Sequence, residues 1–139
     1  MYAPVLEIDT RKVAENARRL HTFCGERGVE LAFVTKGFSA RPEVIRAAME
    51  GGITSFADSR MKNIISAKKA IPGLKYLLIR VPAPDEAEDV VRWADWSLQS
   101  QIEVIRAVSD AALRQGKVHP IILMIDVGDL REGVFGREQ

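Results

Sequence analysis

The sequence predicts an α/β fold of the (β/α)8 TIM-barrel type, present as an incomplete barrel of about six strands and five helices. Along the chain the hydrophobic period switches repeatedly between strand-like runs and helical spacing, which is typical of βα units with parallel strands. A closed eight-stranded barrel usually needs about 250 residues, whereas this chain has 139. We therefore expect part of a longer barrel protein, and a complete small doubly wound domain is the alternative.

Six apolar runs are predicted to form the strands. Each is short and is bounded by turn residues. Two stand out: residues 75–81 are nearly continuous in apolar side chains, which indicates a strand buried on both faces, and residues 120–126 give the strongest strand signal. In chain order the predicted strands are residues 5–9, 31–36, 55–57, 75–81, 96–98 and 120–126.

Capping and turn residues predict where the first two helices begin and end. Asp9 or Thr10 can cap the first helix, and Gly28 ends it. Pro42 lies in the first turn of the second helix, where its missing N–H costs nothing, and Gly51 with Gly52 stops that helix.

The remaining helices follow the same logic. Residues 61–71 are spaced as a helix, and a Pro-Gly turn follows them. Pro84 begins the fourth helix, with two acidic residues at its positive end. Ser100 and Glu103 form a predicted capping box for the fifth, which ends at Gly116. No helix is predicted after the last strand, which is a further sign of an incomplete barrel.

Composition limits the classes of partner. Twenty basic and nineteen acidic residues give a net charge of +1, which argues against nucleic-acid or membrane-surface binding driven by bulk charge. The single cysteine, Cys24, excludes an internal disulfide. No apolar stretch approaches the roughly 20 residues that span a bilayer, and the first nine residues lack the features of a signal peptide. We expect a cytoplasmic protein whose partners are small molecules or another protein chain.

Lys36 is the most informative residue, because it closes the apolar run 31–36 and is followed at once by Gly37. Carboxyl ends of parallel strands form the rim where such folds place reactive groups. A charged lysine is costly to hold in a buried strand, so one interpretation is a Schiff-base amine whose pKa is lowered by burial. The other is a solvent-exposed charge without a chemical role.

Other polar residues are expected at the same rim. Three of them can bind substrate or cofactor there: Asp58, Ser59 and Asn63. The alternative for Ser59 is that it only caps the following helix. Arg80 and Gln99 also follow strands and fall on this edge. The two histidines have no second ligand in view, so no metal site is expected.

The loop of residues 124–133 supplies the group that can stand opposite Lys36. There a long apolar strand ends in Asp126, Asp129 and Arg131, with Gly128 between them. A guanidinium at this position can hydrogen-bond a phenolate oxygen or a substrate carboxylate, while a glycine lets backbone approach a ligand. The alternative is a surface turn with an incidental ion pair.

These motifs resemble the amino-terminal barrel of fold-type III pyridoxal-phosphate enzymes, within which the chain is most similar to the alanine/ornithine racemase branch. The resemblance covers essentially the whole chain, and its most specific part is the last loop. The motifs are PVLEID (4–9), Asn16, FVTK (33–36), FADSR (56–60) with Asn63, and MIDVGDLREG (124–133).

The loop also separates branches within this family. Alanine racemases carry an Asp-Thr-Gly-Met-x-Arg-x-Gly pattern, which this chain matches at four positions, namely Asp126, Gly128, Arg131 and Gly133. Val127 and Asp129 depart from it. The departures favour an ornithine-like enzyme over one that acts on alanine.

The resemblance implies a cofactor, pyridoxal 5'-phosphate, and roles for two residues. Lys36 would form the Schiff base and act as one of two acid/base groups at Cα of an amino-acid substrate. Arg131 would contact the cofactor's phenolic oxygen or the substrate carboxylate. The second acid is a tyrosine of the carboxy-terminal domain in alanine racemases, and neither Tyr2 nor Tyr76 lies in a matching context.

The resemblance therefore predicts an amino-acid racemase, of which residues 1–139 form the amino-terminal part, without the later barrel strands and the carboxy-terminal β domain. A homodimer or higher homo-oligomer is expected, because unpaired strand edges favour association. Two alternatives stay open. One is a non-catalytic pyridoxal-phosphate-binding barrel, and the other is a fold-type III amino-acid decarboxylase.

Overall fold

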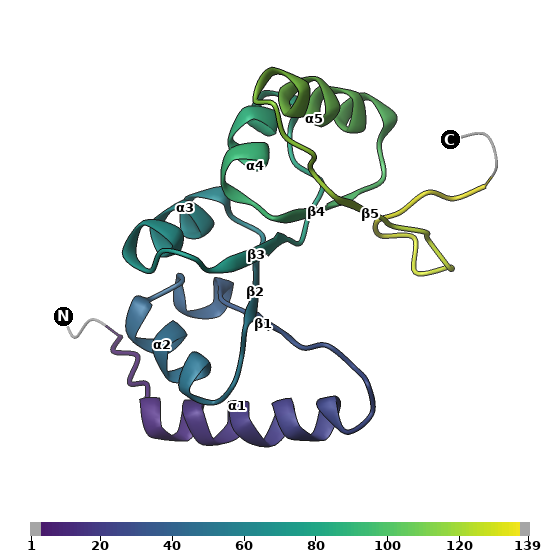
Figure 1. Cartoon of the computed structure of the whole chain (residues 1–139). Helices are drawn as coiled ribbons and strands as arrows, with labels where there is room; N and C mark the ends of the chain where they lie inside the picture. Colours follow the sequence, from purple (N-terminus) through teal and green to yellow (C-terminus); the bar gives the residue numbers. More distant parts are fainter. Residues whose placement is uncertain (1–3, 137–139) are drawn as a thin grey trace.

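A computed structural model describes residues 4–136 as five parallel strands alternating with five α-helices and two short 3-10 turns (Figure 1). The strands are hydrogen-bonded in chain order, β1 to β5. In that order the elements are α1 (Thr10–Gly25), β1 (Ala32–Val34), η1 (Lys36–Phe38), α2 (Pro42–Glu50), β2 (Ser55–Asp58), α3 (Met61–Ala70), β3 (Lys75–Leu78), η2 (Pro84–Glu86), α4 (Ala87–Trp93), β4 (Trp96–Gln99), α5 (Ile102–Arg114) and β5 (Ile121–Leu123).

The predicted α/β class and parallel sheet are confirmed, but the predicted strand at residues 5–9 is wrong. In the described residues 4–9 the chain forms no strand, and Val5 and Leu6 are 83% and 72% exposed. Asp9 instead caps α1, because its carboxylate accepts hydrogen bonds from the backbone N–H of Arg11 and Lys12. β1 is therefore an edge strand, paired on one side only, with β2.

Several predicted boundaries also move. β3 ends at Leu78 rather than at residue 81, and the chain bends at Arg80. Gln101, not Ser100, is the N-cap residue of α5, and no side chain caps that end. α1 ends at Gly25, and Gly28 lies beyond it with a φ of 67°.

The main core lies between the sheet and helices α1 to α4, which line one side of it in Figure 1. Phe56, Tyr76 and Leu78 alternate with residues of the other face, and at most 1% of each is exposed. Phe33, Phe56 and Tyr76 form a row of aromatic contacts across β1 to β3, with centroids 6.3 and 5.8 Å apart. Burying one large apolar side chain stabilises the folded state by about 1.5–3 kcal/mol. These aromatic residues therefore stabilise the pairing of the first three strands.

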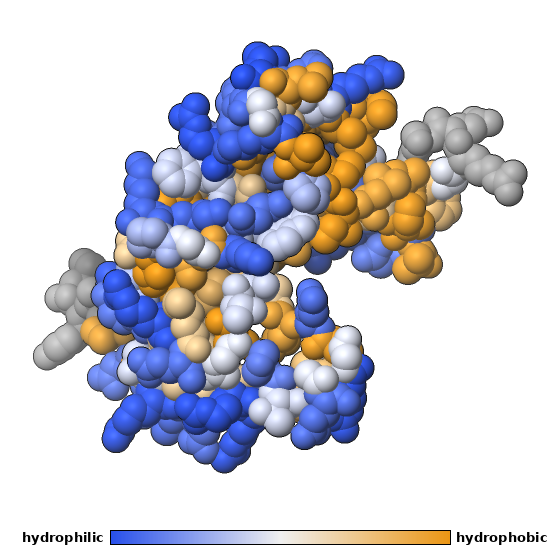
Figure 2. Space-filling view, viewed as in Figure 1, coloured by the Kyte–Doolittle hydropathy of each residue, from blue (hydrophilic) through white to orange (hydrophobic). Residues whose placement is uncertain are grey.

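The last strand is covered far less. Ile121, Ile122 and Leu123 of β5 are 39%, 46% and 50% exposed, although this run gives the strongest strand signal in the sequence and does form a strand. No helix follows β5 within the described residues. Figure 2 shows hydrophobic atoms gathered over β5 and the segment after it. β5 is thus an apolar sheet edge, the kind of surface that pairs with another segment of chain.

Close contact between α1 and α2 depends on one glycine. Gly51 ends α2, and a Cβ atom placed on it would lie 2.5 Å from the Cβ of Ala17 and 2.6 Å from the carbonyl oxygen of Ala14. Only a hydrogen fits in this space, so the small residues on α1 and Gly51 together let the two helices meet.

Gly51→Ala is therefore expected to destabilise the protein by about 1–3 kcal/mol, the usual cost of overpacking. Gly25→Ala is the matched control, because no atom lies within 4 Å of a Cβ there and alanine favours a helix. Urea unfolding followed by circular dichroism measures both. Equal free energies of unfolding for the two variants would contradict the packing argument.

Candidate functional site

Lys36 lies at the carboxyl end of β1, where η1 begins. Its side chain is exposed, and no hydrogen bond or ion pair holds its Nζ within residues 4–136. The expectation that Lys36 closes a buried strand is wrong, because Ala32 and Val34 of β1 are exposed. What the structure provides is a free primary amine at the rim, which is the group that condenses with a carbonyl compound.

The turn that follows Lys36 is strained. Ser39 and Ala40 have φ angles of 54° and 51°, a left-handed conformation that costs non-glycine residues roughly 1–2 kcal/mol each. Three backbone hydrogen bonds close the turn, from the N–H of Phe38 and Ala40 to the Thr35 carbonyl and from Ser39 to Lys36. Such strain persists only where the surroundings enforce it, and it gathers at functional sites.

Four buried polar residues, hereafter the Asp58 cluster, lie beside this turn: Thr35, Asp58, Asn63 and Tyr76. The Asp58 carboxylate accepts from Thr35 Oγ1 at 2.7 Å and from Asn63 Nδ2 at 3.1 Å. Its other oxygen accepts from the backbone N–H of Arg60 at 2.9 Å. The Tyr76 hydroxyl donates in turn to Thr35 Oγ1 at 3.4 Å. The cluster joins the ends of β1 and β2 to the start of α3.

Electrostatics keep the Tyr76 phenol protonated. Burial raises the pKa of Tyr76 to about 12, and the nearby Asp58 carboxylate adds to the effect. A neutral phenol is a hydrogen-bond donor, so at neutral pH the order of donation runs from Tyr76 to Thr35 to Asp58.

Ser59 takes part through its backbone. Its carbonyl accepts a hydrogen bond from Arg80 Nε at 2.6 Å. The Arg80 guanidinium also pairs with both carboxylate oxygens of Glu86 at 2.6 and 2.7 Å, which lowers the pKa of Glu86. Arg80 thereby ties the loop after β2 to the loop after β3, and its charge is already paired.

Gln99, expected at the rim, is fully buried. Its Nε2 donates to Ser97 Oγ at 3.0 Å, and that hydroxyl lies 3.0 Å from Nε2 of His119. Burial lowers the pKa of His119, which favours the neutral ring. These three residues form a separate polar row between β4 and β5.

The loop after β5 is shaped by Asp126. Its Oδ1 accepts hydrogen bonds from the N–H of Gly128 at 2.7 Å and of Leu130 at 3.2 Å, and the first of these is the main cause of a lowered pKa for Asp126. Gly133 is required where the loop closes, because a Cβ there would lie 2.4 Å from the Asp126 nitrogen. Asp129 and Arg131 are exposed on this loop.

Arg131 lines a cavity of about 730 Å³ at the carboxyl ends of β3 to β5, together with Arg80 and the start of α5. Lys36 does not line it. The two residues stand at opposite edges of the sheet, and no ion pair or hydrogen bond joins them in the described part of the chain. The structure therefore places both at the same rim without bringing them into contact.

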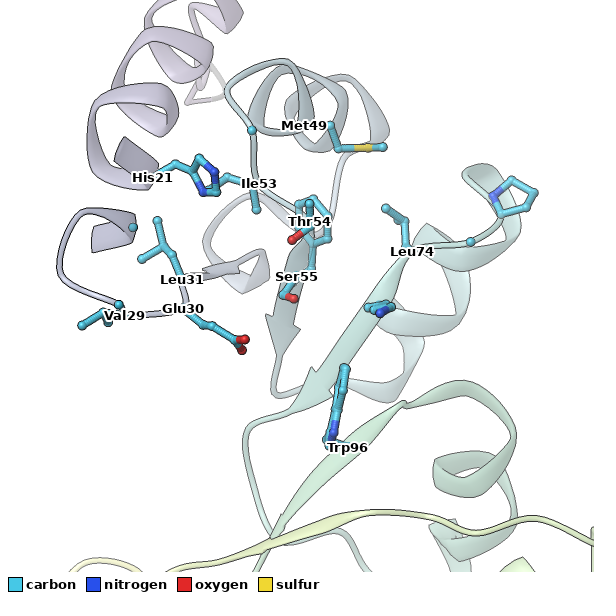
Figure 3. Close-up of a pocket in the computed structure, with 17 residues that line it drawn as sticks. His21, Val29, Glu30, Leu31, Met49, Ile53, Thr54, Ser55, Leu74 and Trp96 are labelled. Carbon is cyan, nitrogen blue, oxygen red and sulfur yellow. The ribbon is translucent and has the colours of Figure 1, made fainter. Parts of the chain in front are cut away.

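A second hollow lies at the amino ends of the strands, on the far side from Lys36. Figure 3 shows His21, Glu30, Thr54, Ser55 and Trp96 around it, among apolar side chains. Catalytic groups of parallel sheets gather at the carboxyl ends, so this hollow is not the candidate site. Among residues 4–136 no group of three or more metal-ligating side chains occurs, and no helix is long and apolar enough to cross a membrane.

Two members of the site were missed from the sequence, Thr35 and Tyr76. Thr35 is a polar residue inside the apolar run just before Lys36, which is a usable signal. Tyr76 lies two residues before Leu78 on β3 and pairs with Phe56 of β2, so it looks like an ordinary core residue. Nothing in the sequence indicates that its hydroxyl contacts Thr35. Asp58 and Asn63 were identified, but as residues that contact a ligand, and both are now found buried.

Comparison with known proteins decides the family. A model of the alanine racemase N-terminal domain matches residues 8–139. The chain belongs to this family. It is 36% identical to the ornithine racemase of Acetoanaerobium sticklandii and 33% identical to the lysine racemase of Thermotoga maritima, each over 135 residues. These alignments cover 97% of this chain but only 38% of each relative.

Solved structures agree on the fold. The alanine racemase of Streptomyces coelicolor superposes with a TM-score of 0.82 at 20% identity, over 94% of this chain and 36% of that chain. Pyridoxal phosphate, the predicted cofactor, is covalently bound in the alanine racemase of Bartonella henselae, with a TM-score of 0.76 at 19% identity over 91% and 36% of the two chains. It is also bound in PipY of Synechococcus elongatus, with a TM-score of 0.72 at 21% identity over 84% and 56%. The cofactor prediction is thus confirmed at the level of the family.

The pKa of Tyr76 predicts how stability changes at high pH. A phenol that ionises near pH 10 in the unfolded chain and at about 12 in the folded one stabilises the fold fully below pH 10. That contribution is lost as pH rises from 10 toward 12. We expect the free energy of unfolding to fall between about pH 9 and about pH 11 by more in the wild type than in Tyr76→Phe. The same decline in both proteins would show that Tyr76 is not the group responsible.

Proposed function

We propose that this chain supplies the cofactor-binding side of a pyridoxal-phosphate-dependent amino-acid racemase, with Lys36 as the amine that holds the cofactor. The observation that carries the proposal is the free, exposed amine of Lys36 at a strained turn, in a chain of the alanine racemase N-terminal domain family. The donor set suits the cofactor, since a primary amine and the exposed guanidinium of Arg131 stand at one rim.

The roles follow from the chemistry of each group. When bound, pyridoxal phosphate acts as an electron sink that makes the Cα proton of an attached amino acid removable. Lys36, displaced by the substrate amine, would take or return that proton on one face. Arg131 would donate hydrogen bonds to the cofactor's phenolic oxygen or the substrate carboxylate. Inversion also requires an acid on the opposite face.

We place that second acid outside residues 1–139, in later barrel strands or a carboxy-terminal β domain. Of the two tyrosines, Tyr76 is fully buried and donates to Thr35, so it cannot serve. Tyr2 lies outside the described residues. The chain spans about 38% of the length of the curated relatives it matches, which supports a site completed elsewhere.

For the substrate we propose an amino acid with a basic side chain. Two observations support it: the matched relatives are an ornithine racemase and a lysine racemase, and Val127 and Asp129 depart from the alanine racemase pattern. Asp126 and Asp129 are candidate partners for a substrate amine. Of these, Asp129 is the more available, because Asp126 already accepts two backbone hydrogen bonds.

The test uses the protein expressed from its complete reading frame. Incubation with pyridoxal phosphate, borohydride reduction and mass spectrometry should locate the cofactor on Lys36. Lys36→Ala should abolish this attachment, whereas Lys62→Ala, at an exposed lysine in the first turn of α3, should retain it. Attachment that survives in Lys36→Ala would exclude Lys36 as the amine.

Reaction class is tested on the same protein. Ornithine and lysine in heavy water should take up deuterium at Cα with loss of optical rotation, faster than alanine does. Attachment without any exchange would indicate a non-catalytic pyridoxal-phosphate-binding barrel. Release of carbon dioxide without inversion would indicate a decarboxylase.

A further inference from the structure

The Asp58 cluster lies immediately behind Lys36 and has no part in the function proposed above. Thr35, Asp58 and Tyr76 are completely buried, and Asn63 is 8% exposed. A buried carboxylate is costly unless it is paired or fully hydrogen-bonded. Asp58 has no ion pair within residues 4–136 but accepts from three donors, Thr35, Asn63 and the Arg60 N–H. The fold thus satisfies this buried carboxyl group with three hydrogen-bond donors.

We propose that Asp58 is a positioning residue for Lys36, acting through the hydroxyl of Thr35. The inference rests on the proposed function of Lys36 as the cofactor-holding amine. Thr35 directly precedes Lys36 and is held by several hydrogen bonds. Its Oγ1 donates to Asp58 at 2.7 Å and lies 3.3 Å from the Ala57 carbonyl, which also accepts from the Thr35 N–H at 2.8 Å. Its own carbonyl accepts from the N–H of Phe38 at 3.3 Å and of Ala40 at 3.1 Å. Of these, the contact with Asp58 is the one made by side chains.

Strain in the turn explains why such an anchor matters. Ser39 and Ala40 are held in a left-handed conformation, so the turn gains free energy by relaxing to ordinary backbone angles. The turn is bonded to the carbonyls of Thr35 and Lys36, so its relaxation would pull on the peptide that carries the amine. The hydrogen bond from Thr35 to Asp58 ties this peptide to the end of β2 and opposes the movement.

This role differs from the ligand contact first expected for Asp58 and Asn63. A fully buried carboxylate that already accepts three hydrogen bonds offers no surface to a substrate at the rim. The same contacts account for why an aspartate and an asparagine stand five residues apart, since the first ends β2 and the second lies in the first turn of α3.

The test compares two substitutions of Thr35 in the protein from its complete reading frame. Thr35→Val keeps the shape but removes the donor, and Thr35→Ser keeps the donor. The first readout is the rate of borohydride-trapped pyridoxal phosphate attachment at Lys36 relative to exposed Lys12. Thr35→Val should lower this ratio by about tenfold or more, because a misplaced amine reacts more slowly. Thr35→Ser should leave the ratio within about threefold of the wild-type value.

A second readout needs no cofactor. Competitive acetylation by acetic anhydride reports the reactivity of the Lys36 amine relative to Lys12, and Thr35→Val should change this ratio by about threefold or more. Melting temperatures confirm that each variant is folded. Asp58→Asn, which keeps the shape and replaces one acceptor oxygen by a donor, should act in the same direction and decides the matter if Thr35→Val does not fold.

The two proposals fail in different ways. If wild-type Lys36 binds pyridoxal phosphate and folded Thr35→Val matches it in both ratios, the positioning role is wrong and the proposed function stands. If wild-type Lys36 binds none, the proposed function is wrong, and the acetylation ratio still decides whether Thr35 positions the amine. Equal losses in Thr35→Val and Thr35→Ser would also overturn the inference, because the hydroxyl would then not be the cause.

Discussion

The site depends on one interaction, the hydrogen bond from Thr35 to the buried carboxylate of Asp58. It connects the ends of two parallel strands at the point where the chain leaves β1 for a strained turn. Around it, Asn63 and the Arg60 N–H bring the start of α3 to the same anion. The aromatic core beneath gives this cluster a rigid base. Lys36 is exposed and has no side-chain partner among residues 4–136, whereas backbone hydrogen bonds from Phe38, Ser39 and Ala40 hold the carbonyls of Thr35 and Lys36.

A second constraint is the open edge of the sheet. The first three strands are covered by helices, whereas β5 leaves its apolar side chains partly exposed. Arg131 follows this exposed strand, and a loop held by Asp126 and Gly133 carries it. The two groups that would hold the cofactor thus come from the two edges of the sheet: Lys36 follows β1, whose Phe33 packs against the core, and Arg131 follows β5, whose side chains are partly exposed. A ligand that contacts both Lys36 and Arg131 would therefore connect β1 to the loop after β5.

The sequence predicted most of the fold for a simple reason: strand and helix periods, caps and turn glycines are local signals. It failed where tertiary contacts decide. Within the described residues, the predicted strand at 5–9 pairs with no other strand, whereas the run at 120–126 does form β5. Lys36 and Arg131 are predicted site residues that rest on strand ends and motif. The structural role of Asp58 and the presence of Thr35 and Tyr76 were not predicted, because hydrogen bonds between strands leave no periodic trace.

The most direct measurement is a crystal structure of the complete protein grown with pyridoxal phosphate. The account predicts continuous electron density between the cofactor and Lys36 Nζ, with Thr35 still hydrogen-bonded to Asp58 and the carboxylate out of reach of the ligand. Density that joins the cofactor to a different lysine, or an Asp58 side chain turned outward to contact the ligand, would contradict it.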